Sequence, residues 1–136
     1  MHLTLVSIVK KFLDLPDIIW VSLPTRDGEI TIFPNHEPLI TALTPGILTV
    51  CIDNKNTQYA VGGGVAEITP THVTIAADMV EDGTHLSIED IRKKKAEVEE
   101  LLKEYKNSNT SMDMDTYIEL EQQLLKEAAR EQLAMK

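Results

Sequence analysis

The first 85 residues alternate between apolar and polar positions with a period of two, which is typical of half-buried β-strands. The alternating segments are rich in Val, Ile and Thr; they are HLTLVSI, DIIWVSLP, EITIF, GILTVCI, TQYAV, GVAEIT and HVTIAA. Turn-forming residues separate them, as at 26–28, 53–56, 70–71 and 82–83. Short strands at such regular spacing predict an antiparallel β-sandwich or flattened barrel.

After residue 85 the pattern changes to that of amphipathic helices. Ser87, with Asp90 three residues later, forms a variant of the capping box and predicts a helix start. Apolar residues at helical spacing then form one stripe before the polar segment NSNTSMD (107–113) and a second stripe after it. The first contains Ile88, Ile91, Val98, Leu101, Leu102 and Tyr105, and the second contains Met114, Tyr117, Ile118, Leu120, Leu124, Leu125, Ala128 and Leu133. Two helices joined so closely predict an antiparallel hairpin.

The predicted fold class is therefore mixed, β followed by α. An N-terminal antiparallel β-sandwich of residues 1–85 precedes a C-terminal two-helix hairpin of residues 86–136. Apolar stripes on helices usually indicate core packing, so we expect the hairpin to pack on the sandwich.

The segment TIFPNHEPLITALTPG (31–46) interrupts the alternation. Its three prolines fix φ near about −65° and lack an N–H donor, which predicts a rigid loop; they are Pro34, Pro38 and Pro45. Asn35 suits a corner with left-handed backbone. A stiff loop loses little entropy on binding, so exposure of Glu29, His36 and Glu37 would suit a docking surface. The alternative is a loop that only connects two strands.

Composition excludes several classes of protein. The chain has 13 Lys and Arg against 22 Asp and Glu, whereas nucleic-acid binding usually requires a basic face. No apolar run approaches the ~20 residues of a membrane span and no signal peptide is recognisable, so we expect a cytoplasmic chain without membrane insertion. The single cysteine, Cys51, has apolar neighbours and is expected to be buried.

The sequence contains no recognisable catalytic or metal-binding constellation. The four histidines, His2, His36, His72 and His85, fall on different predicted elements without metal-ligand spacing. The glycines at 62–64 are not followed by the Lys-Ser/Thr of a phosphate-binding loop, and a bend or bulge explains them better. We therefore expect a protein that is not an enzyme and holds no metal.

Two segments carry a family resemblance. DGEITIFPNHEPLITALTPGILTV (27–50) resembles the signature of the epsilon subunit of bacterial F-type ATP synthases, whose form is close to G-E-L-G-I-Y-P-G-H-A-P-L-L-T-x-L-x-P-G. YAVGGGVAEITPTHVTIAAD (59–78) is similar to later strands of that family. The predicted hairpin stands where the family carries two C-terminal helices.

The resemblance implies a non-catalytic rotor subunit of the central stalk, peripheral to the cytoplasmic face of the cell membrane. It would contact the gamma subunit and the c-ring, and couple proton-driven ring rotation to ATP synthesis. The residues that match the ring-facing edge of the family are Glu29, Phe33, Pro34, Asn35, His36, Glu37 and Pro38. Asn35 replaces the usual glycine, which a left-handed backbone would tolerate.

For the helices, the resemblance implies regulation of ATP hydrolysis, with contacts to the alpha/beta catalytic head. Some members bind ATP near a motif I/L-D-x-x-R-A, where this chain reads IEDIRK (88–93). Glu89, Asp90 and Arg92 are thus candidate nucleotide-binding residues, with ATP as a weak regulatory ligand and no other cofactor. Lys93 in place of the alanine argues against tight binding, and the excess of acids on the second helix argues against docking on an acidic head.

The alternative function is that of a free-standing adaptor. Its helical hairpin would capture a helix of a partner through Leu120, Leu124 and Leu125. Full burial of these leucines against the sandwich would exclude this hypothesis.

Overall fold

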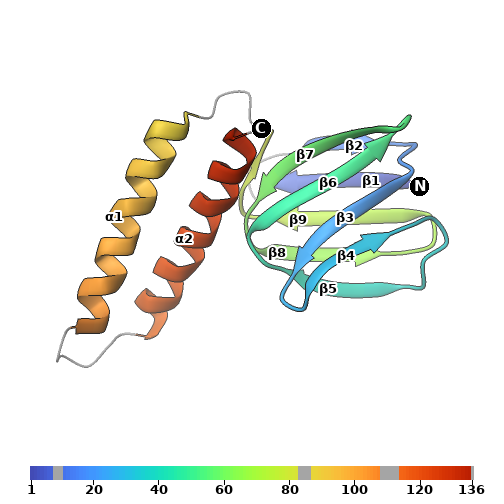
Figure 1. The fold of residues 1–136 in the computed structure, drawn as a ribbon. Helices are drawn as coiled ribbons and strands as arrows, with labels where there is room; N and C mark the ends of the chain where they lie inside the picture. Colours follow the sequence, from blue (N-terminus) through green and yellow to red (C-terminus); the bar gives the residue numbers. More distant parts are fainter. Residues whose placement is uncertain (8–10, 83–86, 108–113, 136) are drawn as a thin grey trace.

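The computed structural model describes residues 1–7, 11–82, 87–107 and 114–135, and Figure 1 shows a β-sandwich followed by two helices. The strands are β1 (His2–Ser7), β2 (Lys11–Leu15), β3 (Trp20–Thr25), β4 (Gly28–Ile32), β5 (Leu39–Leu43), β6 (Gly46–Ile52), β7 (Lys55–Val61), β8 (Gly64–Ile68), β9 (His72–Ala77) and β10 (Val80–Glu81). The helices are α1 (Ile88–Asn107) and α2 (Met114–Ala134). The predicted fold class is confirmed. The boundary at 85/86 lies outside the described residues, so the division into two domains stays a prediction.

The strands form one curled sheet in the order β10-β7-β6-β3-β5-β8-β9-β1-β2, with β4 paired to β3. The curl lays β7, β6, β3 and β4 over the remaining long strands (Figure 1). All pairings are antiparallel except that of β1 with β9, which is parallel and joins His2 to His72 and Ser7 to Ala77. The first strand of the chain thus lies beside one of the last, between β9 and the edge strand β2.

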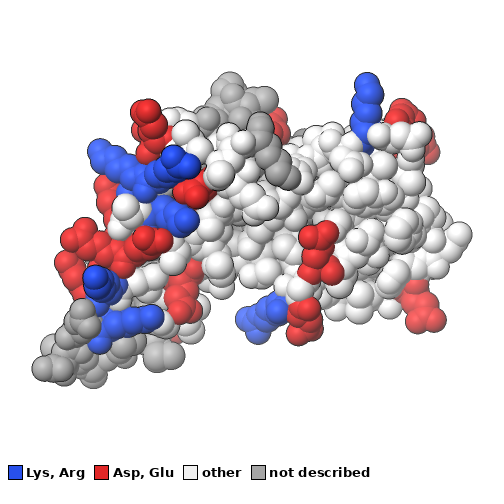
Figure 2. All heavy atoms as spheres, viewed as in Figure 1, with Lys and Arg blue, Asp and Glu red and all other residues white. Residues whose placement is uncertain are grey.

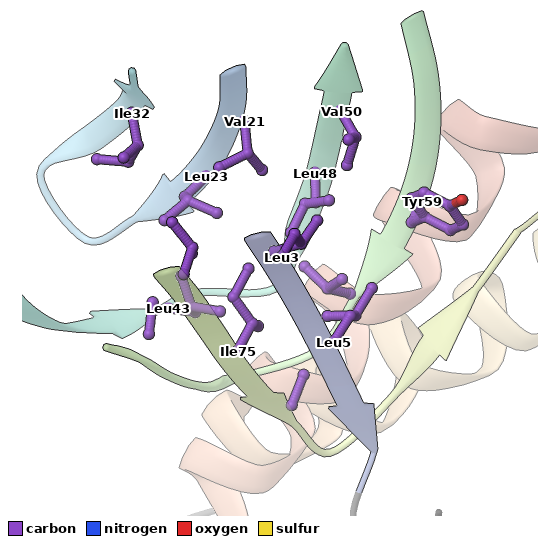
Figure 3. Close-up of a cluster of buried hydrophobic side chains, with 14 of the residues drawn as sticks. Leu3, Leu5, Val21, Leu23, Ile32, Leu43, Leu48, Val50, Tyr59 and Ile75 are labelled. Atoms are coloured by element: carbon purple, nitrogen blue, oxygen red, sulfur yellow. The ribbon is translucent and has the colours of Figure 1, made fainter. Parts of the chain in front are cut away.

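The core lies between the two layers and comes from the alternation seen in the sequence. Strand β9 alternates strictly between exposed and buried positions, with Val73, Ile75 and Ala77 inward. Figure 3 shows inward-pointing side chains from both layers, among them Leu3, Leu5, Val21, Leu23, Ile32, Leu43, Leu48, Val50, Tyr59 and Ile75. Each fully buried aliphatic side chain contributes about 1.5–3 kcal/mol relative to exposure. Cys51 is buried, as predicted.

The sequence pattern did not predict three of the strands, namely β2, β5 and β10. Strand β5 lies inside the segment 31–46, which the prolines predict to be one rigid loop, so that prediction is wrong for residues 39–43. The strand is apolar on both faces, so it shows no alternation: Leu43 is buried but Ile40 is 73% exposed. The loop itself is limited to residues 33–38.

The glycine run makes the bend that the sequence predicted, between β7 and β8. The Gly62 N–H donates to the carbonyl of Met79, and the Asp78 N–H donates to the carbonyl of Gly63. A Cβ at Gly64 would lie 2.0 Å from the carbonyl oxygen of Ala76, so only glycine fits there. The glycines therefore bring the β7–β8 corner against residues 78–79, which connect β9 to β10.

The capping prediction for the first helix is confirmed. α1 begins at Ile88, and the Asp90 N–H lies 3.5 Å from Ser87 Oγ. Its apolar stripe is narrower than expected, since Ile91, Val98 and Leu102 are buried but Leu101 is exposed.

The helices form the predicted antiparallel hairpin. α2 packs against β6 and β7, and α1 lies on the far side of α2 (Figure 1). The connection between the helices, residues 108–113, lies outside the described residues. The hairpin thus contacts the sandwich mainly through one helix.

Candidate functional site

Residues 33–38 connect β4 to β5 and form a loop that we call the tip. It lies at the end of the sandwich away from the helices (Figure 1). Phe33 is 56% exposed, and Pro34, Asn35, Glu37 and Pro38 are also exposed. His36 is half-buried. Six of the seven residues predicted for ring contact are therefore together on one accessible loop.

Backbone contacts brace the tip. Asn35 has φ of 66°, so the predicted left-handed backbone is confirmed. Its N–H donates to the carbonyl of Pro70 in the β8–β9 turn, with N and O 2.9 Å apart. His36 Nδ1 lies 2.7 Å from the Glu37 carbonyl, which can only accept, so Nδ1 carries the proton. The tip is tied to the rest of the sandwich as well as stiffened by its prolines.

Glu29, the seventh residue, lies apart from the tip. It is near the start of β4, opposite Pro24, whereas the tip follows the other end of that strand. Ser22 Oγ donates to Glu29 Oε1 at 2.5 Å, which holds the carboxylate on the outer surface of β3 and β4. Its assignment to the same contact as the tip stays a prediction.

Two further histidines lie at the tip end of the sandwich. The rings of His2 and His72 stack with centroids 5.0 Å apart, and His2 Nε2 contacts the carboxylate of Asp14. Sequence spacing missed this pair because parallel pairing of β1 with β9 joins residues far apart in the chain. Within the described residues, no group of three or more His, Cys, Asp or Glu side chains could hold a metal ion.

Ion pairs join α2 to the sandwich, and we call this set the clamp. Lys126 Nζ lies 2.6 Å from Asp78 Oδ2, and Arg130 Nε lies 2.7 Å from Glu81 Oε2. Arg130 also pairs with Glu127, which is buried, at 3.0 Å. Burial alone would lower the pKa of Arg130, but its hydrogen bond to Glu81 and the charges of both glutamates raise it above its usual value. Arg130 therefore stays charged inside the clamp.

The candidate nucleotide residues do not converge. Glu89, Asp90 and Arg92 are all exposed, and Arg92 Nε lies 3.9 Å from Glu131 Oε2 on α2. A cavity of about 330 Å³ opens beside the start of α1, and of the three it includes only Asp90. Its cationic lining comes from Lys93, Lys94 and Arg130 instead.

Comparison with known proteins decides the family. Residues 1–83 match the family described as the beta-sandwich domain of the ATP synthase delta/epsilon chain, which is more than half of the 136 residues. The chain belongs to this family. The resemblance noted in the sequence is thereby confirmed, and the match includes the whole tip and the β8–β9 turn that braces it.

Curated relatives in this epsilon family agree. The chain is 42% identical over 80 residues to the ATP synthase epsilon chain of Chloroflexus aggregans, covering 59% of this chain and 57% of that relative. It is 38% identical over 96 residues to the epsilon chain of Delftia acidovorans, covering 70% of this chain and 67% of that relative. The chain thus spans less than three fifths of the length of the Chloroflexus relative.

Solved structures of ATP synthases extend the likeness to the helices. A chain of the Euglena gracilis mitochondrial ATP synthase, solved as OSCP/F1/c-ring in rotational state 1, matches with a TM-score of 0.73 and 25% identity over 96% of this chain and 78% of that one. A chain of the central stalk/c-ring of the Tetrahymena thermophila mitochondrial enzyme matches with a TM-score of 0.60 and 15% identity over 95% and 96%, which shows the fold alone. Neither helix of this epsilon-family chain, as far as it is described, is long and apolar enough to cross a bilayer.

Proposed function

We propose that this epsilon-family chain is a non-catalytic subunit of the central stalk of an F-type ATP synthase, at the cytoplasmic face of the membrane. It contacts the c-ring and the gamma subunit and couples proton-driven rotation to ATP synthesis. The observation that carries this proposal is the exposed, braced tip on a sandwich that matches the epsilon family. A structural neighbour belongs to an ATP synthase assembly that was solved with its c-ring, and this supports the same partners.

The tip suits transmission of torque. A contact that transmits rotation must keep its geometry. A loop with little conformational freedom already has that geometry and loses little entropy on binding. The prolines, the left-handed Asn35 and the hydrogen bond to Pro70 all restrict the loop. Phe33 offers an apolar anchor and Glu37 a charge at the same end. The helices lie at the other end, so ring contact leaves them unobstructed (Figure 1).

Complementation tests this proposal. The chain is expressed in a strain that lacks its epsilon subunit, and growth on a non-fermentable carbon source and co-purification with gamma and the c-ring are measured. We expect the unsubstituted chain to restore both, Phe33→Ser to lose ring contact, and Met135→Ser, a similarly exposed residue on the hairpin at 62%, to behave as the unsubstituted chain. Failure of the unsubstituted chain to complement or co-purify overturns the proposal.

We also propose that the hairpin regulates ATP hydrolysis, with the clamp holding it on the sandwich. The two ion pairs of the clamp lie near the surface, and such pairs break more easily than contacts in a buried core. Contact of a released hairpin with the alpha/beta head would be weak, since the exposed charged residues of α2, which are Asp115, Glu119 and Glu121, are all acidic. Loss of the clamp by Arg130→Met should therefore change the rate of ATP hydrolysis by the assembled enzyme but leave ring contact intact.

A weak nucleotide site is a second candidate, supported by Lys93, Lys94 and Arg130 around one cavity. Asp90 and Glu97 line the same cavity and oppose a polyphosphate, which agrees with the expectation of weak binding. Titration calorimetry with magnesium-free ATP tests this candidate, with Lys94→Ala as the matched variant. Absence of heat at millimolar ATP would end it.

The adaptor alternative retains one supporting observation. Leu120 and Leu124 are half-buried and Leu125 is exposed, so the leucines are not fully buried. The family match nevertheless rests on the sandwich, which an adaptor that works through its hairpin would not require. The rotor function is therefore the better supported of the two.

A further inference from the structure

The β8–β9 turn, residues 69–72, is closed by a side chain. The Thr69 N–H donates to the carbonyl of His72 at 2.8 Å, one position beyond the last strand pair of Ile68 with Val73. The His72 N–H donates to Thr69 Oγ1 at 3.0 Å. In an ordinary β-turn the carbonyl of the first residue accepts this N–H, so the hydroxyl takes over a backbone role. Oγ1 also donates to the His72 carbonyl at 3.3 Å. The shape of the turn therefore depends on the Thr69 hydroxyl.

The turn holds two other segments at the same end of the sandwich. Its Pro70 carbonyl accepts from the Asn35 N–H of the tip, with N and O 2.9 Å apart. Its Thr71 carbonyl accepts from the His2 N–H at the start of β1, also at 2.9 Å. Both carbonyls lie inside the turn, so the way in which the turn is closed sets their positions.

The hydrogen bond from Asn35 is the contact through which the turn acts on the tip. The bond of His36 to Glu37 is internal to the tip, whereas that of Asn35 reaches a different part of the sandwich. Asn35 has φ of 66°, a backbone conformation that costs energy for a residue with a side chain. Asn35 is also exposed, so water can replace the Pro70 carbonyl as acceptor if the turn moves away. The tip would then lose this attachment without leaving a polar group unsatisfied.

We infer that Thr69 is a positioning residue for ring contact. Its hydroxyl closes the turn, the turn fixes the Pro70 carbonyl, and that carbonyl holds Asn35 and with it the tip. The inference rests on the proposed function and adds to it a residue outside the tip. A loosened tip has to be ordered when it binds the ring, and this ordering lowers the affinity. Loss of the hydroxyl should therefore weaken ring binding although every side chain of the tip is unchanged.

Three variants of the full chain test this role. Thr69→Val removes the hydroxyl and keeps the β-branched shape, Thr69→Ser keeps the hydroxyl, and Thr74→Val makes the same change at an exposed position of β9. Amide hydrogen exchange at Asn35 is followed by NMR. The dissociation constant for purified c-ring in detergent is measured by biolayer interferometry.

We expect Thr69→Val to speed exchange at Asn35 and to weaken ring binding, each about fivefold, which is the effect of losing one hydrogen bond. Thr69→Ser should restore both values, and Thr74→Val should change neither. Exchange at Ile75, which is buried in the core, is the internal reference and should stay unchanged in all three variants. Faster exchange at Ile75 to the same extent as at Asn35 would show a global loss of stability and overturn the positioning role.

The remaining outcomes separate the inference from the proposed function. If the unsubstituted chain binds the ring and Thr69→Val binds it as tightly, the inference is wrong and the rotor function stands. Weaker ring binding by Thr69→Val with unchanged exchange at Asn35 would make Thr69 a direct contact, which also overturns the positioning role. If the unsubstituted chain does not bind the ring, the proposed function is overturned together with the inference.

Discussion

The sandwich and the hairpin are held in place by different interactions. A continuous apolar core fills the space between the two layers of the sandwich. The hairpin instead meets the sandwich through α2, where Lys126 and Arg130 pair with acids on the strand side. Apolar burial depends little on salt, whereas ion pairs near the surface are screened by it. On the face drawn in Figure 2, the charged side chains are concentrated on the hairpin. The chain thus combines a part that should unfold only globally with a part that can separate locally.

The largest effect is expected in the sandwich. Leu48 is fully buried, so Leu48→Ala should lower the free energy of unfolding by about 2–5 kcal/mol through lost burial and a cavity. Leu101→Ala, at an exposed position on α1, should change it far less. Urea unfolding followed by circular dichroism measures both. Equal effects would contradict the contrast between the two parts.

The next effect concerns the clamp. Arg130→Met leaves buried Glu127 and the partner Glu81 without their cation, which should weaken docking of α2 by about 2–3 kcal/mol. Hydrogen exchange should rise in α2 and stay unchanged in β9. Lys103→Met, at an exposed position on α1, is the control. Uniform loss of protection over the whole chain would show that the clamp supports global folding instead.

A smaller effect is expected at the tip. Asn35→Val places a β-branched residue at φ of 66°, which should cost about 1–2 kcal/mol of unfolding free energy, while Asn35→Gly should be tolerated. Ring binding should fall for the valine variant and persist for the glycine variant. Equal ring binding by both would show that backbone stiffness is not what the contact requires.

The smallest effect is expected at alkaline pH. Burial, assisted by the charge of Asp82, raises the pKa of Tyr59 above its usual value of 10.0. The folded state therefore holds this proton more tightly, so the contribution to stability is full below pH 10.0 and falls as pH rises through the folded pKa. Thermal unfolding across this range should show a smaller alkaline loss for Tyr59→Phe. A pH dependence identical to that of the unsubstituted chain would exclude Tyr59 as the cause.

Local patterns in the sequence predicted the parts of the fold that depend on local physics. The capping by Ser87, the left-handed Asn35 and the buried Cys51 each follow from one residue and its neighbours. Alternation failed for β5 because apolar side chains occupy both of its faces: Leu43 is buried and Ile40 is exposed. A strand with apolar residues on both faces lacks the period-two signal by which half-buried strands are recognised.

The candidate site was predictable only where it is continuous in sequence. Residues 33–38 form one loop, so the prolines and the family signature located it. The stacked His2 and His72 depend on the parallel pairing, and the clamp joins Arg130 to Glu81 across the whole first helix. No periodicity or spacing encodes such contacts, because they arise only when distant elements pack together.

The parallel pairing of β1 with β9 also bears on how the chain is made. Residues 2–7 can pair with β2 early, but their other partner, residues 72–77, is synthesised much later, so the sheet cannot be completed while the N-terminal half alone has left the ribosome. Pairing across so long a separation in sequence also slows folding. The proposed assembly into a rotor would therefore have to wait until nearly the whole sandwich is translated.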